Sequence, residues 1–284
     1  MTDALRPTAE QTQHAWAARV RANREQVEQF RETTTSDFYA PVARMFRADP
    51  RRTDDPVLDA LRSLIQPSDV VLDIGAGGGR LALPLALVAR EVIALEPSAG
   101  MLEVLRTGMQ EHGISNIQVI DGRWPQVQPR ADVALMSQIG YDIEDIGPFL
   151  DALDTSIARL CIAVLLDRPP PAEADRLWPD VHGVQRAALP AMPEFLTLLL
   201  SRGVVPEVRL TERGPQSYPD PDVLLAWVRG QLWTKPDSDK DRQLQRLVAE
   251  RAERRDDHVA LSWQPVQLGI VTWRSGMRGA PLGQ

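Results

Sequence analysis

Apolar residues near the N-terminus recur at helical spacing. Between positions 10 and 32 they are separated by three, four and seven residues, which places them on one side of a helix: Trp16, Val20, Val27 and Phe30. A second, shorter helical pattern lies within 57–65. We therefore expect a helical cap or lid over residues 1–66, in which Phe38 and Tyr39 either close over a ligand or anchor the segment to the core.

From residue 70 onward, short aliphatic runs alternate with helix-length segments. This alternation is typical of parallel strands joined by crossover helices. The runs are nearly continuous, which indicates that helices cover both faces of the sheet. We expect strands at 70–74, 92–95, 117–120, 133–136 and 160–166, with helices at about 79–89, 98–112 and 143–156. Two more strands are expected at 204–210 and 266–273.

The main domain is predicted to span residues 67–275, with insertions at about 168–203 and 212–264 that form a lid. Within the second insertion, Ser238-x-x-Asp241 resembles a capping box and predicts the start of a helix. The charged run Glu250–Asp257 is read as a solvated helix face. Residues 276–284 are expected to be a flexible tail.

Composition agrees with a globular protein and narrows its partners. The chain has 284 residues, of which 43% are hydrophobic and 25% charged. Thirty-two basic against 39 acidic residues leave a formal charge of −7, the wrong sign for binding nucleic-acid phosphates. No stretch reaches the roughly 18 apolar residues of a membrane helix, and the first thirty residues are polar. We expect a cytoplasmic protein with neither a nucleic-acid partner nor a membrane span.

Thiolate and metal chemistry are not indicated. Cys161 is the only cysteine and lies in an aliphatic run, so neither an internal disulfide nor a thiolate metal cluster can form. The four histidines are scattered without a spacing suited to joint ligation. We predict no metal site.

The chemistry-bearing segment is a buried strand that leads into a glycine loop and then a helix. Glycine allows a sharp turn and close approach of a ligand to bare backbone, and the helix start presents unpaired N–H groups. The dinucleotide pattern G-x-G-x-x-G is not met, because Arg80 stands where its third glycine would fall. The segment reads instead D-x-G-x-G-x-G, from Asp73 through Gly75 and Gly77 to Gly79.

This pattern resembles motif I of the class I S-adenosylmethionine-dependent methyltransferases, small-molecule type. The resemblance covers residues 70–166 at motif level, and the strand pattern extends it to about 273. It implies a three-layer Rossmann-like α/β fold with a seven-stranded, mostly parallel sheet of order 3-2-1-4-5-7-6 and a helical insertion between the last two strands. Residues 67–275 would then be a methyltransferase domain.

The resemblance also implies a cofactor, S-adenosyl-L-methionine, and its contacts. Glu96, 21 residues after Gly75, would accept the ribose hydroxyls, and Asp121-Gly122 would bind adenine. The segment from Ser137 to Tyr141 would lie beside the sulfonium methyl. The cofactor-binding residues implied are Asp73, Gly75, Ala76, Gly77, Gly79, Glu96, Pro97, Asp121, Gly122, Ser137 and Gln138.

For catalysis we single out Tyr141 and His182. Tyr141 is placed either on the acceptor side or under a lid, and His182 either reaches the pocket or is an exposed loop residue. Methyl transfer needs alignment more than a covalent residue, and a base only if the acceptor must lose a proton. No Asn/Asp-Pro-Pro-aromatic motif follows the fourth strand, which disfavours base amines as acceptors.

The expected activity is methyl transfer by in-line displacement to a small-molecule acceptor. Five tryptophans in the added segments either line an apolar chamber or pack the lid: Trp16, Trp178, Trp227, Trp233 and Trp263. The alternatives are a non-catalytic protein that binds the cofactor or its product and uses the inserted helices as a partner surface, and, with less support, a nucleotide-cofactor oxidoreductase. A protein acceptor also stays open.

Overall fold

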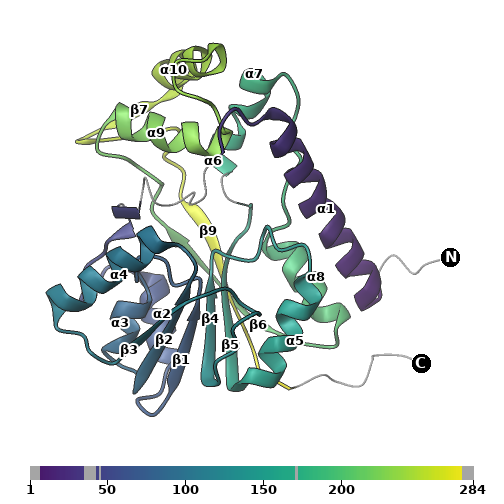
Figure 1. The fold of residues 1–284 in the computed structure, drawn as a ribbon, viewed down its shortest axis with the longest axis vertical. Helices are drawn as coiled ribbons and strands as arrows, with labels where there is room; N and C mark the ends of the chain where they lie inside the picture. The colour runs from purple at the N-terminus through teal and green to yellow at the C-terminus, as the bar shows by residue number, and fades with distance from the viewer. Residues whose placement is uncertain (1–6, 35–42, 45, 170–171, 277–284) are drawn as a thin grey trace.

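A seven-stranded sheet organises the part of the chain that the computed structural model describes, residues 7–34, 43–44, 46–169 and 172–276. The strand order is β3-β2-β1-β4-β5-β9-β6, and only β9 runs antiparallel to its neighbours (Figure 1). The expected fold class and strand order are confirmed. The strands are β1 (Val70–Ile74), β2 (Glu91–Glu96), β3 (Ile117–Asp121), β4 (Ala131–Ser137), β5 (Ile157–Leu166), β6 (Glu207–Arg213) and β9 (Val266–Trp273).

Helices cover both sides of the sheet, in agreement with the mostly aliphatic sequences of β1, β4 and β5. In Figure 1, α2, α3 and α4 lie on one side and α5 and α8 on the other. The bounds are α2 (Pro56–Leu64), α3 (Ala82–Ala86), α4 (Ala99–His112), α5 (Ile146–Ser156) and α8 (Met192–Ser201). The helix expected at 79–89 is shorter at both ends and spans Ala82–Ala86, and Gly79, with φ +84°, lies outside the helical region.

A second group of elements, called the lid below, has its own hydrophobic core and lies beyond the carboxyl ends of the parallel strands (Figure 1). It consists of α6 (Ala172–Asp175), α7 (Trp178–His182), α9 (Pro221–Leu232), α10 (Asp239–Arg251), β7 (Glu253–Arg255) and β8 (His258–Ala260). Helix α8, although within the insertion expected at 168–203, packs into the core of the sheet and not into the lid. The lid therefore draws on the first part of that insertion and on the second insertion.

Local differences from the expected elements have local causes. The chain from Glu250 to Asp257 is not one helix face: α10 ends at Arg251, and β7 and β8 form a hairpin that turns at Asp256, with φ +47°. Strand β6 begins at Glu207 and not at residue 204, because Pro206 has no N–H to donate to a ladder. The start of α10 was correctly predicted, since the Ser238 side chain accepts a hydrogen bond from the backbone of Asp241.

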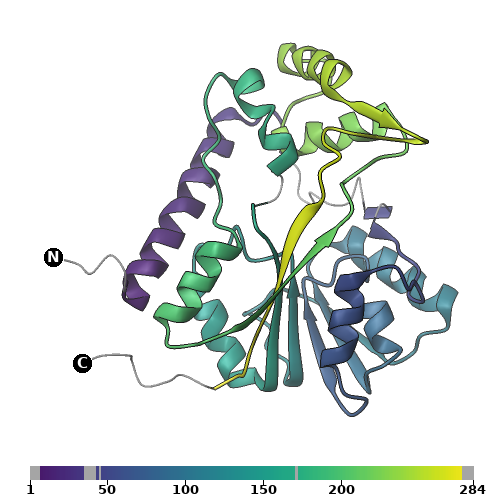
Figure 2. The ribbon, with the colours of Figure 1, turned by 180° about the vertical axis from the view of Figure 1, so that it is seen from behind.

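Helix α1 (Ala9–Phe30) connects the sheet to the lid (Figure 2). Near its beginning, the Trp16 indole N–H donates to the backbone oxygen of Ile143 at 2.9 Å, and its ring meets Phe195 edge-on at 6.3 Å. Beyond its end, the Glu32 carboxylate accepts a hydrogen bond from the backbone N–H of Lys235 at 2.9 Å, between α9 and α10. One helix thus holds two separate hydrophobic cores in place.

Two expectations lie outside the described residues: the aromatic pair Phe38 and Tyr39, and the tail from residue 277 to 284. The searched segments contain no helix with the length and apolar character needed to cross a bilayer.

Trp16→Ala should lower the free energy of unfolding by about 3–5 kcal/mol, because the indole is buried (4% exposed) and its removal leaves a cavity between α1 and the sheet. Chemical denaturation followed by circular dichroism measures this loss. His14→Ala, on the exposed side of the same helix, is the matched control and should change stability by less than about 0.5 kcal/mol. Equal effects of the two substitutions would contradict the connecting role of Trp16.

Candidate functional site

The glycine loop between β1 and α3 turns directly over the end of β2. The backbone N–H groups of Gly75 and Ala76 both donate to the Leu95 oxygen, at 2.8 and 3.2 Å. Gly75, Gly77 and Gly79 have φ values of +71°, +54° and +84°, the left-handed region in which L side chains are strained. Glycine at these three alternating positions therefore allows the backbone to adopt the turn without side-chain strain.

The three glycines differ in what surrounds them. A Cβ atom on Gly75 would lie 2.9 Å from the Ile139 side chain, and one on Gly79 would lie 2.5 Å from that of Leu105. On Gly77 the nearest described atom would be the Met101 sulfur at 3.9 Å, an ordinary contact. Gly75 and Gly79 are thus needed for packing, whereas a Cβ atom on Gly77 would clash with no described residue.

Carboxylates stand at the ends of neighbouring strands beside this loop. Glu96 ends β2 and pairs in register with Asp121, which ends β3. The Glu96 side chain is only 6% exposed and accepts hydrogen bonds from the backbone N–H groups of Gly77 at 2.9 Å and Ser98 at 2.8 Å. Asp121 is exposed, and the N–H of Gly122 donates to the Glu96 backbone oxygen at 3.3 Å. The structure brings these predicted cofactor residues together.

Asp73 lies under the loop and is buried, with 2% of its surface exposed. It accepts a hydrogen bond from the backbone N–H of Ala82, the first residue of α3. Its Oδ2 atom has no hydrogen-bond partner among the described residues. Burial, and next the charge of Glu96, raise the pKa of Asp73 to about 7. A buried oxygen without a partner at a strand end is a candidate ligand contact.

The segment after β4 closes the site on the other side of the loop. Gln138, which follows Ser137, has φ +55°, a strained value for a side-chain-bearing residue, and its N–H donates to the Val164 oxygen at 2.8 Å. Tyr141 is 4% exposed and its hydroxyl oxygen accepts the N–H of Leu166 at 2.8 Å. Burial raises the pKa of Tyr141, so the phenol keeps its proton.

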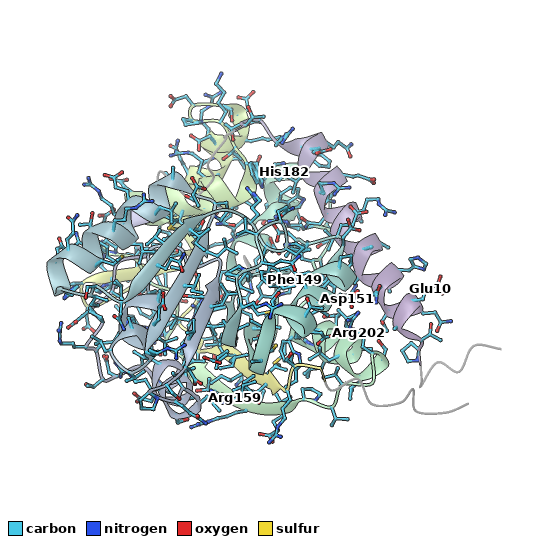
Figure 3. The ribbon with its side chains drawn as sticks, turned by 60° about the horizontal axis from the view of Figure 1, so that its bottom comes forward. Glu10, Phe149, Asp151, Arg159, His182 and Arg202 are labelled. Carbon is cyan, nitrogen blue, oxygen red and sulfur yellow. The ribbon has the colours of Figure 1, made fainter. Side chains whose placement is uncertain are left out.

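His182 belongs to the lid core (Figure 3). Its ring lies 4.1 Å from that of Trp178 and 5.5 Å from that of Phe30, and its Nε2 atom lies 3.0 Å from the Leu232 oxygen. Burial lowers the pKa of His182 to about 4, so the imidazole is neutral at physiological pH. The structure does not bring His182 together with the strand-end residues.

Sequence reasoning missed two side chains next to the loop. Ser98 caps the start of α4 by accepting a hydrogen bond from the Met101 N–H at 3.2 Å, and its own N–H orients Glu96. Pro97 joins these two residues. A serine directly before a helical pattern is a sequence signal for such a cap. Ile139, which packs on Gly75, gave no comparable signal.

The described residues contain no cluster of potential ligands for a metal ion.

The sequence model of a family described as "Methyltransferase domain" matches residues 71–154. This segment is a methyltransferase domain. It runs from β1 into α5 and so contains the glycine loop, the strand-end carboxylates and the segment after β4. The match and the strand order confirm the resemblance to the class I S-adenosylmethionine-dependent methyltransferases.

Curated relatives match parts of the chain. A probable ribosomal RNA small subunit methyltransferase A of Methanosphaera stadtmanae is 38% identical over 126 residues, 44% of this chain and 45% of that protein. An uncharacterized protein of Haemophilus influenzae is 33% identical over 115 residues, 39% of each chain. The chain thus spans less than half the length of these relatives.

Two solved structures share the fold around the methyltransferase domain. One, from Bacillus halodurans and provisionally assigned as a methyltransferase, has a TM-score of 0.52 and 15% identity, covering 77% of this chain and 98% of that chain. The other is magnesium protoporphyrin IX methyltransferase from Synechocystis with bound S-adenosylhomocysteine, with a TM-score of 0.52 and 13% identity, covering 89% and 100%. At these identities the likeness concerns the fold alone.

Asp73→Asn should become more stabilising relative to the native protein as pH rises from about 4 to 7. A carboxyl whose pKa is raised by folding contributes stability below its unfolded pKa and loses that contribution as pH rises through the folded value of about 7. Asparagine does not titrate, so the difference in unfolding free energy should grow by a few kcal/mol over this range and then level off. Denaturation at several pH values measures it, and parallel curves would contradict a raised pKa of Asp73.

Gly79→Ala should destabilise the protein more than Gly77→Ala. Both substitutions put a Cβ at positive φ, at a cost of about 1–2 kcal/mol. Only the alanine at position 79 also meets Leu105 at 2.5 Å, which adds about 1–3 kcal/mol of overpacking. Urea denaturation compares the two variants, and equal losses would refute the different surroundings of Gly77 and Gly79.

Proposed function

We propose that this protein is an S-adenosylmethionine-dependent methyltransferase that transfers a methyl group by in-line displacement to a small-molecule acceptor. The match of residues 71–154 to methyltransferase domains supports the reaction class. The observation that carries the proposal is the arrangement of Gly77, where a Cβ atom would meet no described atom closer than 3.9 Å, beside the buried carboxylate of Glu96.

The residues present suit such a cofactor. Glu96 is held by two backbone N–H groups at the end of β2, where a ribose diol would donate its hydrogen bonds. Asp121 and the Gly122 backbone end β3, where adenine would lie. The unpartnered Oδ2 of Asp73 offers an acceptor beneath the loop. A cationic group near Asp73 favours its ionised form, so cofactor binding would lower the pKa of this carboxyl.

When bound, the cofactor supplies an electrophilic methyl group on a sulfonium. The chain's own task is to align the acceptor and exclude water. The neutral phenol of Tyr141, fixed by Leu166, is suited to donate a hydrogen bond to an acceptor atom and so to orient it. His182, packed in the lid core, positions the lid in this proposal and does not touch the reacting atoms.

Two features favour a small molecule as the acceptor. The lid lies over the carboxyl ends of the strands, and the net charge of −7 disfavours a polyanionic partner. Methylation of pyrimidine carbon C5 on this fold requires a cysteine nucleophile, but Cys161 is fully buried in β5 and burial raises the pKa of its thiol. Ribosomal RNA, named for some relatives, is therefore not the acceptor that we propose.

Glu96→Gln should weaken binding of S-adenosylmethionine and S-adenosylhomocysteine by about 1.5–3 kcal/mol, the range for hydrogen bonds to a charged group. Isothermal titration calorimetry measures both ligands without an acceptor. Glu103→Gln, on the exposed face of α4, is the matched control and should bind as the native protein does.

Native affinity of the Glu96→Gln variant would remove this residue from the cofactor site. No affinity of the native protein for either ligand would overturn the proposed function. A non-catalytic cofactor-binding protein would bind both ligands but release no S-adenosylhomocysteine with any acceptor, whereas an enzyme releases it with its own substrate.

A further inference from the structure

Arg213 lies at the same end of the sheet as the candidate site, where the parallel strands have their carboxyl ends. It is the last residue of β6 and pairs with Val266, while two residues further along β9 Leu268 pairs with Leu166 at the end of β5. Leu166 in turn holds the hydroxyl of Tyr141. The β-ladder therefore carries the Arg213 side chain to the acceptor side of the methyltransferase domain.

The guanidinium of Arg213 has lost much of its hydration without gaining a counter-ion. The residue is half-buried, and among the described residues no hydrogen bond or ion pair holds its side chain. Burial, and next the charge of Arg80, lower the pKa of Arg213. Holding a charge in this environment without a partner costs free energy, so the position needs an explanation other than stability.

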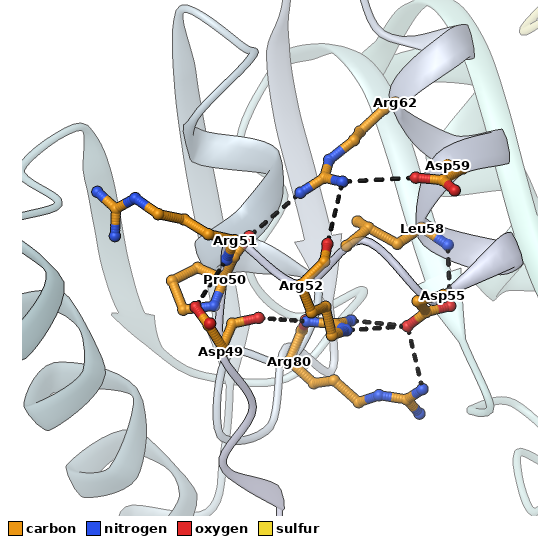
Figure 4. Close-up of polar contacts among 9 residues, drawn as sticks. All are labelled: Asp49, Pro50, Arg51, Arg52, Asp55, Leu58, Asp59, Arg62 and Arg80. Atoms are coloured by element: carbon orange, nitrogen blue, oxygen red, sulfur yellow. Dashed lines mark hydrogen bonds and ion pairs between the residues drawn. The ribbon is translucent and has the colours of Figure 1, made fainter.

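A second arginine adds to the positive charge. Arg80, next to the glycine loop, reaches Asp55 at 3.4 Å, but the same carboxylate oxygen is held more closely by Arg52 at 2.9 Å (Figure 4). The negative charge of Asp55 also raises the pKa of Arg213, but less than burial lowers it. Two guanidinium groups, those of Arg52 and Arg80, thus share one carboxylate, and no described ion pair joins Asp55 to Arg213.

Other acidic groups nearby do not neutralise this cluster. Besides burial, the charge of Asp167 raises the pKa of Tyr141, and its carboxylate lies 3.9 Å from Arg168. Besides burial, the charge of Glu173 raises the pKa of Tyr218. Neither carboxylate forms a described ion pair with Arg213. The hydroxyls of Tyr141 and Tyr218 both lie within the electrostatic reach of Arg213. A guanidinium group offers parallel N–H donors in the geometry that a planar anion binds.

We propose that Arg213, together with Arg80, binds an anionic group of the methyl acceptor, a carboxylate or a phosphate. This inference rests on the proposed function and adds to it the chemical class of the substrate. The anion replaces the counter-ion that Arg213 lacks, and it directs the rest of the molecule toward Tyr141 and the glycine loop.

The test measures anion binding to protein saturated with S-adenosylhomocysteine, at constant ionic strength. Benzoate is compared with benzamide, which has the same shape without the charge, and inorganic phosphate is titrated separately to distinguish the two anion classes. We expect benzoate or phosphate to bind, benzoate at least about tenfold more tightly than benzamide if the group is a carboxylate. Calorimetry and the shift of the melting temperature report binding.

Arg213→Gln should abolish the preference for the anion, and Arg80→Gln should weaken it. Arg209→Gln, an exposed position on the same strand, is the matched control and should bind as the native protein does. Because Arg213 has no described ion pair to lose, the free Arg213→Gln variant should melt at or above the native temperature. A structural ion pair would give the opposite result.

The inference is overturned if neither anion binds the saturated native protein, or if Arg213→Gln binds it as tightly as the native protein does. The proposed function survives both results, because binding of S-adenosylhomocysteine is measured first. A native protein that fails to bind S-adenosylhomocysteine overturns both.

Discussion

The hydrogen bond between the Gly77 backbone N–H and the Glu96 carboxylate joins the loop after β1 to the end of β2, and the candidate site is built on these two segments. It fixes the glycine loop over β2 and holds a buried acid beside bare backbone. The bond depends on positive φ at Gly77 and on the turn that Gly75 and Ala76 make over Leu95. The rest of the sheet is a scaffold that keeps these short segments in register.

Much of this scaffold could be predicted from the sequence because its signals are local. Continuous aliphatic runs mark strands covered on both faces, and the spacing of Asp73, the glycines and Glu96 marks the loop and its acid. The acceptor side could not be predicted in the same way. Arg213 is brought to the end of the sheet where Leu166 holds Tyr141 by the pairing of β6 with β9, strands separated by more than fifty residues, and no spacing along the chain records that pairing.

The position of His182 could not be predicted from the sequence either, because it also depends on a contact between residues far apart along the chain. A histidine between a tryptophan and a proline-flanked helix suits a pocket as well as a core in the sequence. His182 lies in the core because it packs against Trp178 on its own helix and against Phe30 on α1, which lies about 150 residues earlier. The unfavourable features instead gather at the strand ends: a carboxyl with a raised pKa at Asp73, a strained backbone at Gln138 and, at Arg213, an arginine with no ion pair among the residues that the structure describes. Such a concentration is typical of sites where stability is sacrificed for binding.

The attachment of α1 to both hydrophobic cores restricts how molecules can enter and leave. Because α1 is one uninterrupted helix, anchored near one end by Trp16 and beyond the other by Glu32, the lid cannot swing away as an independent body. Any movement of the lid away from the sheet must either tilt the whole helix about its tryptophan anchor or break the bonds of Glu32. The position of the lid is thereby linked to the rigidity of a segment that lies outside the part of the chain matched by the methyltransferase model.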